Sequence, residues 1–283
     1  MIKNIVFSGA GIKIYAFIGV LKALKEHDLL KNITSLIGTS AGAVISIALC
    51  LDYDCDEIEE LMLKIKIDRL KDFSSSDIIN CFNTYGIDNG SNFKRLFKII
   101  IKAKTQKENI TFKELYELTK KKITITATCV NSMETRYFNY EKTPDFYVED
   151  ALLMSISIPF LFTPVKHDNK LYIDGGLTNN YPIDFFEDDL KNTLGILITT
   201  SINKCYDINN IEDYVSSIFL SSYYKLLRNC YNKYINNTIL LENTFNFIDF
   251  NISMENKKKL IEFGYKDAVT FITSDNFKKF YDL

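Results

Sequence analysis

Gly38-Thr39-Ser40-Ala41-Gly42 is the stretch of this chain that decides the fold. It follows the apolar run 33–37 and leads directly into the apolar, helix-compatible segment 43–51. A strand, a G-x-S-x-G pentapeptide and a helix in this order are typical of a nucleophile elbow, in which a serine hydroxyl projects from a strained turn. Glycines on both sides of the serine remove side chains that would collide there. Ser40 is therefore the candidate nucleophile.

The base that would activate Ser40 is not expected to be a histidine. The chain has only two histidines, His27 and His167. An α/β-hydrolase needs its histidine after the acid in chain order, and no histidine follows His167. His27 lies near the end of the first predicted helix and His167 lies in a polar turn, and side chains at such positions are usually solvated. Another group must accept the proton.

Asp174 is the carboxylate best placed to accept that proton. It ends the β-rich run 171–173 and is followed by Gly175-Gly176. An Asp-Gly pair alone usually marks an ordinary turn. Because a candidate nucleophile and a glycine loop near the N-terminus accompany this pair, we predict that Asp174 is the base.

The glycine loop is Gly9-Ala10-Gly11, which ends the predicted strand 3–7 and opens a predicted helix that reaches about residue 26. The N-terminus of that helix directs free backbone N–H groups and the positive end of its dipole at the turn, which suits an oxyanion or a phosphate. A dinucleotide-binding turn is the alternative interpretation. It would require a glycine where Ile14 stands and an acidic residue where the next strand ends in Thr39-Ser40, so it is disfavoured.

Taken together, these motifs resemble those of the patatin-like phospholipases. Three motifs lie in the family's order, and three weaker segments accompany them. The three motifs are residues 7–24, 38–42 and 174–176. The three weaker segments are residues 157–165, 177–182 and 260–265. The resemblance implies that Ser40 and Asp174 form a catalytic dyad without a histidine. It is poor between residues 52 and 122.

The resemblance also implies an oxyanion hole formed by the backbone amides of Gly9, Ala10 and Gly11, with help from the amide of Ala41. The chain departs from the family at two positions. Ala10 stands where the family favours a glycine, and Ile14 stands where it favours another small residue. If Ala10 required a positive φ, the hole would be reshaped, because an alanine has a narrower range of dihedral angles than a glycine.

Lys13 occupies the family's basic position. We expect it either to pair with a substrate phosphate or to be a solvated lysine at the start of a helix. No cofactor and no metal are expected. Calcium is disfavoured because no acidic loop has the ligand spacing of an EF-hand, and backbone amides already serve the oxyanion.

Strand and helix signals alternate along the chain, which predicts an α/β fold with a mostly parallel central sheet flanked by helices. The expected strands are 3–7, 34–38, 123–130, 135–139, 170–173, 194–200 and 237–241. The resemblance makes this a patatin-like domain, and we expect a single domain over residues 1–283.

Residues 52–122 are expected to form a helical lid or cap inserted into that domain. Three amphipathic helices are predicted over 57–70, 92–103 and 111–122, separated by turns at 72–76 and 85–91. The alternative is a plain structural excursion that completes the core. Residues 205–283 are expected to be a C-terminal extension of helices and strand packed on the core, and the tyrosines of the helical run 205–235 are assigned to surface packing.

Composition excludes several classes of protein. A net charge of −2 and a pI of about 5.8 argue against a dedicated nucleic-acid-binding protein. Six scattered cysteines without C-x-x-C spacing suggest neither a zinc site nor a disulfide framework, so a reducing, cytoplasmic location is expected. No signal peptide is apparent, and the longest apolar stretch, 41–51, is far shorter than the ~20 residues of a membrane span. Any membrane contact is expected to be peripheral.

The predicted function is a serine acyl hydrolase that cleaves acyl esters of glycerophospholipids, as a phospholipase A or lipid acyl hydrolase does. Ser40 would attack the ester carbonyl while Asp174 accepts the proton. Two alternatives stay open. One is an acyltransferase or transacylase that uses the same dyad, and the other is a lipid-surface binding protein whose catalysis is weakened by Ala10 and Ile14.

Overall fold

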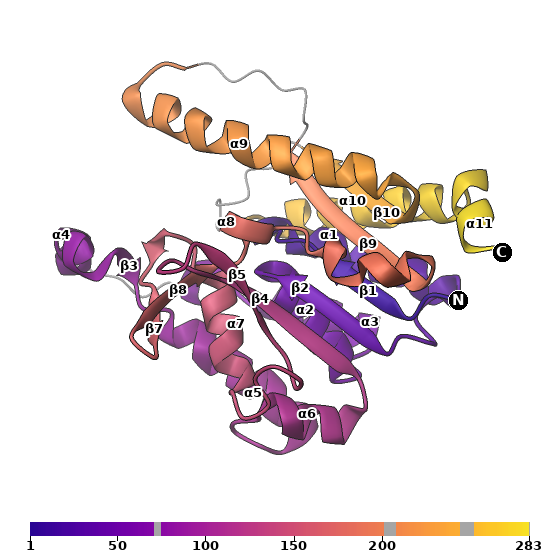
Figure 1. Cartoon of the computed structure of the whole chain (residues 1–283), viewed down its shortest axis with the longest axis horizontal. Coiled ribbons are helices and arrows are strands. Elements are labelled where there is room, and N and C mark those ends of the chain that lie inside the picture. The colour runs from indigo at the N-terminus through magenta and orange to yellow at the C-terminus, as the bar shows by residue number, and fades with distance from the viewer. Residues whose placement is uncertain (71–74, 201–207, 244–251, 283) are drawn as a thin grey trace.

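A computed structural model describes residues 1–70, 75–200, 208–243 and 252–282 of the protein. Its centre is an eight-stranded sheet with helices on both faces (Figure 1). The strand order is β10-β9-β1-β2-β4-β8-β7, and β5 pairs with β4. The strands are β1 (Asn4–Phe7), β2 (Ser35–Thr39), β4 (Lys122–Cys129), β5 (Glu134–Phe138), β7 (Val165–His167), β8 (Lys170–Asp174), β9 (Thr193–Thr200) and β10 (Thr238–Asn243).

The sheet is mostly parallel, as the alternation of strand and helix signals predicted. β10, β9, β1, β2 and β4 run parallel to their neighbours, whereas β5 and β8 pair antiparallel with β4, and β7 pairs antiparallel with β8. Each of the seven expected strands is present within two residues of its expected bounds. The α/β class and the mostly parallel sheet are thus confirmed.

Eleven helices are assigned in the described part of the chain, together with short 3₁₀ segments. They are α1 (Ile14–Glu26), α2 (Ala41–Cys50), α3 (Cys55–Lys64), α4 (Ser75–Thr84), α5 (Ser91–Thr105), α6 (Phe112–Thr119), α7 (Val148–Ile156), α8 (Gly176–Asn179), α9 (Ile211–Lys233), α10 (Met254–Ile272) and α11 (Asp275–Tyr281). The 3₁₀ segments are Gly11–Lys13, Ile67–Leu70, Ile183–Asn192 and Ile235–Asn237.

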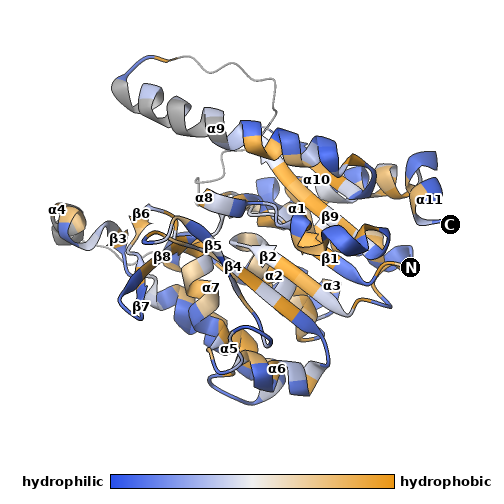
Figure 2. Cartoon of the chain, in the orientation of Figure 1, coloured by the Kyte–Doolittle hydropathy of each residue, from blue (hydrophilic) through white to orange (hydrophobic). Residues whose placement is uncertain are grey.

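The side chains of the central strands alternate between two hydrophobic clusters, one on each face of the sheet. Ile5, Phe7 and Leu36 contribute to the larger cluster, which α1, α2 and α10 cover. Val6 and Ile37 contribute to a smaller cluster with residues of β9, α9 and the 183–192 segment. The apolar strands and the amphipathic helices around them are visible in Figure 2. A strand buried on both faces in this way reads as a continuous apolar run.

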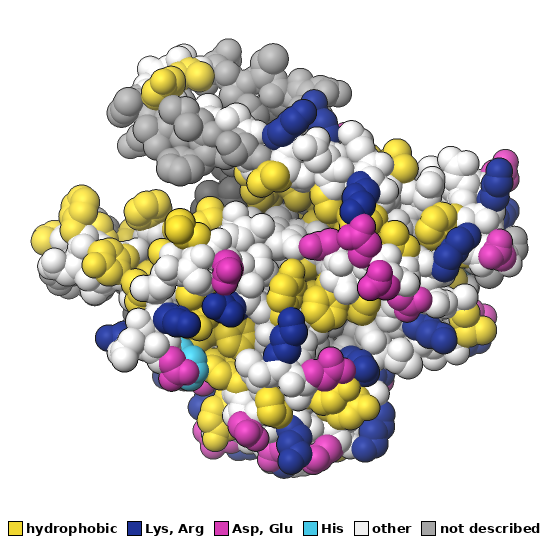
Figure 3. Space-filling view, in the orientation of Figure 1, with side chains coloured by type: hydrophobic (Ala, Val, Ile, Leu, Met, Phe, Trp, Pro, Cys, Tyr) yellow, Lys and Arg dark blue, Asp and Glu magenta, His cyan; other side chains and the backbone are white. Residues whose placement is uncertain are grey.

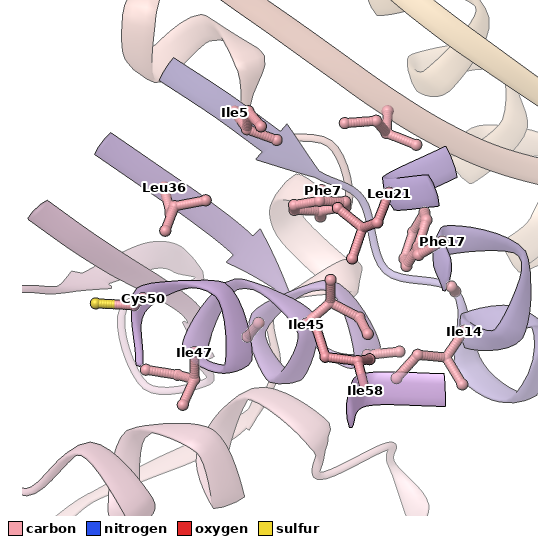
Figure 4. Close-up of a cluster of buried hydrophobic side chains, with 14 of the residues drawn as sticks. Ile5, Phe7, Ile14, Phe17, Leu21, Leu36, Ile45, Ile47, Cys50 and Ile58 are labelled. Carbon is pink, nitrogen blue, oxygen red and sulfur yellow. The ribbon is translucent and has the colours of Figure 1, made fainter. Parts of the chain in front are cut away.

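The core between β1 and helices α1 and α2 is tightly interdigitated. Figure 4 shows Phe7 of β1 beside Phe17 and Leu21 of α1, above Ile45 of α2. The rings of Phe7 and Phe17 meet edge to face at a centroid distance of 5.2 Å. This packing fixes the glycine loop after β1 and the turn before α2, because both adjoin the same core.

Helix α1 also crosses α10 at very close range. A Cβ on Gly19 would lie 1.9 Å from the carbonyl oxygen of Ile261, and a Cβ on Gly264 would lie 2.0 Å from that of Ala16. Only glycine permits this approach of the two backbones. The crossing holds the C-terminal segment against the core and accounts for Gly264 within the family-like stretch 260–265.

The segment 52–122 differs from its predicted organisation. The predicted helix 57–70 ends at Lys64, because Ile65 is extended, and a 3₁₀ turn follows at Ile67–Leu70. Of the predicted turn at 72–76, residues 72–74 lie outside the described residues, and residues 75 and 76 belong to α4, which was not expected as a helix. Strand β3 (Gly86–Asp88) falls in the predicted turn 85–91 and pairs with β6 (Phe160–Phe162) in a separate two-stranded sheet. Strands of three residues are too short to show a periodic pattern.

Candidate active site

Ser40 lies on the sharp turn between the end of β2 and the start of α2. Its φ of 53° and ψ of −123° place a non-glycine residue in a strained conformation. The Ser40 N–H donates to the Ser155 hydroxyl of α7 at 2.8 Å, which holds the turn from the other side. A Cβ on Gly42 would lie 2.4 Å from the Ser8 carbonyl oxygen, so the pentapeptide needs a glycine there.

Asp174 lies at the end of β8, and its carboxylate faces Ser40. The Ser40 hydroxyl donates to Oδ2 at 2.5 Å, and the Gly176 N–H donates to Oδ1 at 2.7 Å. The backbone of Asp174 is held at both ends: its N–H donates to the Ser157 carbonyl at 2.8 Å, and its carbonyl accepts from the Thr128 hydroxyl at 2.9 Å. The structure thus brings together the two side chains that the sequence singled out.

Burial changes the chemistry of this carboxylate. Ser40 and Asp174 are each only 7% exposed. Desolvation raises the pKa of Asp174 to about 6, although the hydrogen bonds from Ser40 and Gly176 oppose the shift. A base with this pKa is stronger than an exposed aspartate and is still ionised at neutral pH.

The glycine loop lies beside the two side chains and is held by Asn180. The Gly9 N–H donates to the Asn180 carbonyl at 3.0 Å, so the amide of Gly9 is already occupied. The amides of Ala10 and Gly11 donate to no acceptor among the residues that the structure describes. The proposed oxyanion donors therefore narrow to Ala10, Gly11 and the Ala41 amide in the first turn of α2.

The alanine at position 10 does not strain the loop. Its φ is −140°, which an alanine adopts freely, whereas Gly11 has a φ of 52°. Ala10 therefore does not need a positive φ, and its alanine side chain gives no reason to expect a reshaped oxyanion hole.

Lys13 lies inside the site, so its interpretation as a solvated lysine is wrong. The residue is 2% exposed, and its Nζ donates to the Thr200 hydroxyl of β9 at 3.0 Å. Burial lowers the pKa of Lys13 to about 8. Among the described residues no carboxylate pairs with this ammonium group. A buried cation with no carboxylate among its described neighbours is suited to an anionic ligand.

Two cavities meet at Ser40. The larger has a volume of about 370 Å³ and is lined by Lys13, Asp174 and the glycine loop. The smaller, of about 90 Å³, is lined almost entirely by apolar side chains, among them Met62 of α3 and Phe97 of α5. Helices of the 52–122 segment thus wall the site, whereas the role of this segment as a mobile lid stays a prediction.

Sequence reasoning missed several residues of the site. Tyr223, Tyr224 and Leu226 of α9 line the larger cavity, although the tyrosines were assigned to surface packing. Their spacing in a helix is the same for a surface and for a cavity wall, so the sequence held no signal to separate the two. Ser155 gave no signal either, because its contact with Ser40 depends on where α7 packs.

The two histidines lie elsewhere in the molecule. His27 is exposed just after α1, and His167 packs against the Phe146 ring at a centroid distance of 4.9 Å and contacts Asp168 at 3.2 Å. Neither histidine lines the cavities at Ser40. His167 ends β7 and was expected in a turn.

The described residues hold no group of three or more His, Cys, Asp or Glu side chains arranged for a metal ion. Five cysteines lie in the described ranges, each unpaired, and Cys205 falls outside them. Within those ranges no helix is both long enough and apolar enough to cross a bilayer.

Comparisons with known proteins agree on one family. A model described as patatin-like phospholipase matches residues 5–186. The uncharacterized protein R571 of Acanthamoeba polyphaga mimivirus is 32% identical over 281 residues, which cover 94% of this chain and 92% of R571. The probable lipid hydrolase 463L of Invertebrate iridescent virus 6 is 32% identical over 188 residues, covering 64% of this chain and 62% of that protein.

The fold is shared with a solved structure. The crystal structure of VipD from Legionella pneumophila superposes with a TM-score of 0.66 at 17% identity, over 95% of this chain and 66% of VipD. The central sheet and its flanking helices are therefore parts of a known architecture. This chain belongs to the patatin-like phospholipase family.

Proposed function

We propose that this protein is a serine acyl hydrolase that cleaves acyl esters of glycerophospholipids, with Ser40 as the nucleophile and Asp174 as the base. The observation that carries the proposal is the 2.5 Å hydrogen bond from the Ser40 hydroxyl to Asp174, located where two cavities meet. Family membership supports a lipid ester as the substrate. The name of the iridescent virus relative, a probable lipid hydrolase, agrees with it.

In the first half of the reaction, Ser40 Oγ forms a bond to the ester carbonyl carbon while its proton passes to Asp174 Oδ2. The tetrahedral oxyanion accepts hydrogen bonds from the amides of Ala10, Gly11 and Ala41. The carbon–oxygen bond to the alcohol then breaks, and Asp174 returns the proton to the departing oxygen. An acyl-serine and a free alcohol, here a lysophospholipid, are the result.

In the second half, water attacks the acyl carbon and gives a proton to Asp174. Collapse of this intermediate releases the fatty acid, and Ser40 Oγ takes the proton back from Asp174. Because Asp174 both accepts and returns each proton, no net proton is stored in the enzyme. The same carboxylate thus serves both halves.

The two cavities suggest how the substrate is oriented. The smaller one is apolar and reaches Ser40, so it suits the acyl chain. The larger one holds Lys13, so it suits the glycerophosphate part, with the phosphate near the buried ammonium group. Two opposed environments on either side of the nucleophile favour a phospholipid over a neutral ester.

Labelling with a fluorophosphonate tests whether the serine is activated. We expect the wild-type protein to be labelled and the Ser40→Ala variant to remain unlabelled. Ser46→Ala is the matched control, because Ser46 is a buried serine of the neighbouring helix α2 and should leave the labelling intact. Equal labelling of wild type and Ser40→Ala would contradict the proposal, and so would no labelling of either.

Mass spectrometry of a mixed-lipid vesicle digest identifies the substrate. We expect lysophospholipid and free fatty acid in equal amounts, with no effect of EDTA. Acyl chains transferred to an added alcohol in preference to water would show that the protein is a transacylase. Vesicle binding without any product would show a lipid-surface binding protein.

A further inference from the structure

One end of the molecule carries a cluster of exposed apolar side chains, which we call the α4–β6 surface. Its members are Ile79 and Phe82 of α4, Tyr85 just before β3, and Phe160 of β6. They are 77%, 88%, 59% and 81% exposed. Figure 3 shows hydrophobic side chains gathered over α4 and the adjoining strands at the left of the molecule. Large apolar side chains concentrated in one exposed place mark an interaction site.

The backbone of this surface brings two of its aromatic residues together. Gly86 of β3 pairs with Phe160 of β6, which brings the two aromatic residues Tyr85 and Phe160 to one edge. Both have a positive φ, 61° for Tyr85 and 68° for Phe160. Tyr85 directly follows the end of α4 and Phe160 is the first residue of β6, so each lies where the chain changes direction.

The side chains that make up this surface are apolar, and few charged residues lie near them in sequence. Neither residues 78–87 nor residues 151–165, the two segments that carry these side chains, contain a charged residue. A partner recognised through complementary charge would require a different composition. The chemistry of this surface suits the apolar and interfacial region of a lipid bilayer.

The α4–β6 surface is continuous with the cavities at Ser40. Phe160 directly follows Ile158 and Pro159, which line the larger cavity. Leu177 and Leu226 line the same cavity and are themselves exposed. Apolar residues of the chain segment 158–160 therefore lie both on the exposed surface and in the wall of the cavity that holds the nucleophile.

We propose that the α4–β6 surface docks this protein on a lipid bilayer, with Phe82 and Phe160 inserted at the membrane interface. The proposal rests on the proposed function, because the lipid hydrolase role places the substrate in the bilayer. Since the four exposed side chains of this surface are apolar, docking through them does not require anionic lipids and depends little on salt.

Flotation with phosphatidylcholine vesicles tests the proposal, using protein that also carries Ser40→Ala so that the vesicles are not consumed. The test variant combines Phe82→Gln, which a helix tolerates, with Phe160→Asn, because asparagine tolerates a positive φ. The matched control combines Ile99→Gln on α5 with Leu118→Gln on α6, whose residues are 60% and 57% exposed. In Figure 1, α6 lies far from α4.

We expect the test variant to lose about tenfold or more of its vesicle partitioning, since two large apolar side chains no longer leave water. The control should stay within about twofold, because its residues lie outside the surface. With Ser40 restored, both variants should hydrolyse a water-soluble short-chain ester at the wild-type rate. That result would show that the catalytic site is intact.

Three outcomes separate the proposals. Equal partitioning of the test variant and the control would overturn the docking proposal and leave the hydrolase intact. A wild-type dimer that the test variant dissociates, with no vesicle binding by either, would identify a second copy of the chain as the occupant and also overturn it. Vesicle binding through this surface without hydrolysis of any lipid would support docking and refute the proposed function.

Discussion

Replacement of Asp174 by asparagine is expected to inactivate the protein and, at the same time, to stabilise it at alkaline pH. The asparagine oxygen can still accept the Gly176 N–H, which donates to Asp174 at 2.7 Å in the wild type. The asparagine NH2 group can donate to Ser40 Oγ, which lies 2.5 Å from Asp174 Oδ2 in the wild type, so neither group loses its hydrogen-bond partner. What the substitution removes is a negative charge at a position only 7% exposed. Activity and stability should therefore change in opposite directions.

The magnitude follows from the pKa shift. Burial raises the pKa of Asp174 from 3.8 to about 6, so the folded protein binds this proton more tightly than the unfolded chain does. A raised carboxyl pKa contributes stability that is complete below 3.8 and is lost as the pH rises through about 6. Asparagine is neutral at every pH. The free energy of unfolding of Asp174→Asn, relative to wild type, should thus increase by about 2–3 kcal/mol between about pH 4 and about pH 8.

Urea unfolding at about pH 4, 6 and 8 measures this difference, and Asp145→Asn, at an exposed aspartate, is the matched control. The control should show no comparable pH-dependent gain. Ester hydrolysis by Asp174→Asn should fall by about a thousandfold or more, because the base is gone. A difference in unfolding free energy that does not vary with pH would refute the desolvation argument. Near-wild-type turnover would refute the assignment of the base.

Three further predictions concern the neighbours of the dyad and the core. Ser155→Ala leaves the buried N–H of Ser40 without its acceptor, so steady-state kinetics should show a kcat about tenfold lower with little change in KM. Ser46→Ala is the control, because the Ser46 hydroxyl is buried and has no partner among the described residues, and it should change neither kcat nor KM. Lys13→Met should raise KM for phospholipid but not for a short neutral ester. In the wild-type protein, turnover of phospholipid alone should decline above about pH 8, because Lys13 loses its proton there. Gly19→Ala should lower the free energy of unfolding by about 2 kcal/mol or more in urea, because its Cβ would meet a carbonyl oxygen of α10 at 1.9 Å.

The parts of the site that the sequence predicted are those that follow strand ends. Ser40 follows β2, Asp174 closes β8, and the glycine loop follows β1. Each carries a local signal, since a strand that stops in glycine, serine or aspartate is a short pattern in the chain. No local pattern shows that Ser40 and Asp174 lie close together in space, because they are 134 residues apart in sequence.

The pairing register of the strands explains why Ser40 and Asp174 lie close together. Thr39 of β2 pairs with Thr126 of β4, and the next residue of β4, Ala127, pairs with Asp174 of β8. The base therefore lies across β4 from the nucleophile. The sequence predicted all three strands, and the motifs at their ends singled out Ser40 and Asp174. It did not indicate that β8 pairs antiparallel with β4, which is the pairing that brings the two side chains together.

The features that the sequence did not predict depend on where a helix packs. Tyr223 and Tyr224 line the larger cavity because α9 lies over that side of the sheet, and their helical spacing would be the same on any surface. Strands β3 and β6 have three residues each, so neither shows an alternation. For Lys13 the sequence offered a substrate-phosphate partner or a solvated position at the start of a helix, and it gave no sign of the packing against β9 that buries the side chain.

Burial acts on the two ionisable groups of the larger cavity in opposite directions. It raises the pKa of Asp174 to about 6 and lowers that of Lys13 to about 8, because each charged form loses hydration. Both groups are ionised together only between these values. Below that range the base is protonated, and above it the cation for an anionic ligand is lost. If the proposed phospholipid hydrolysis uses both groups, their burial sets its pH range. Any change that admits water near Lys13 should then extend the alkaline limit and leave the acid limit in place.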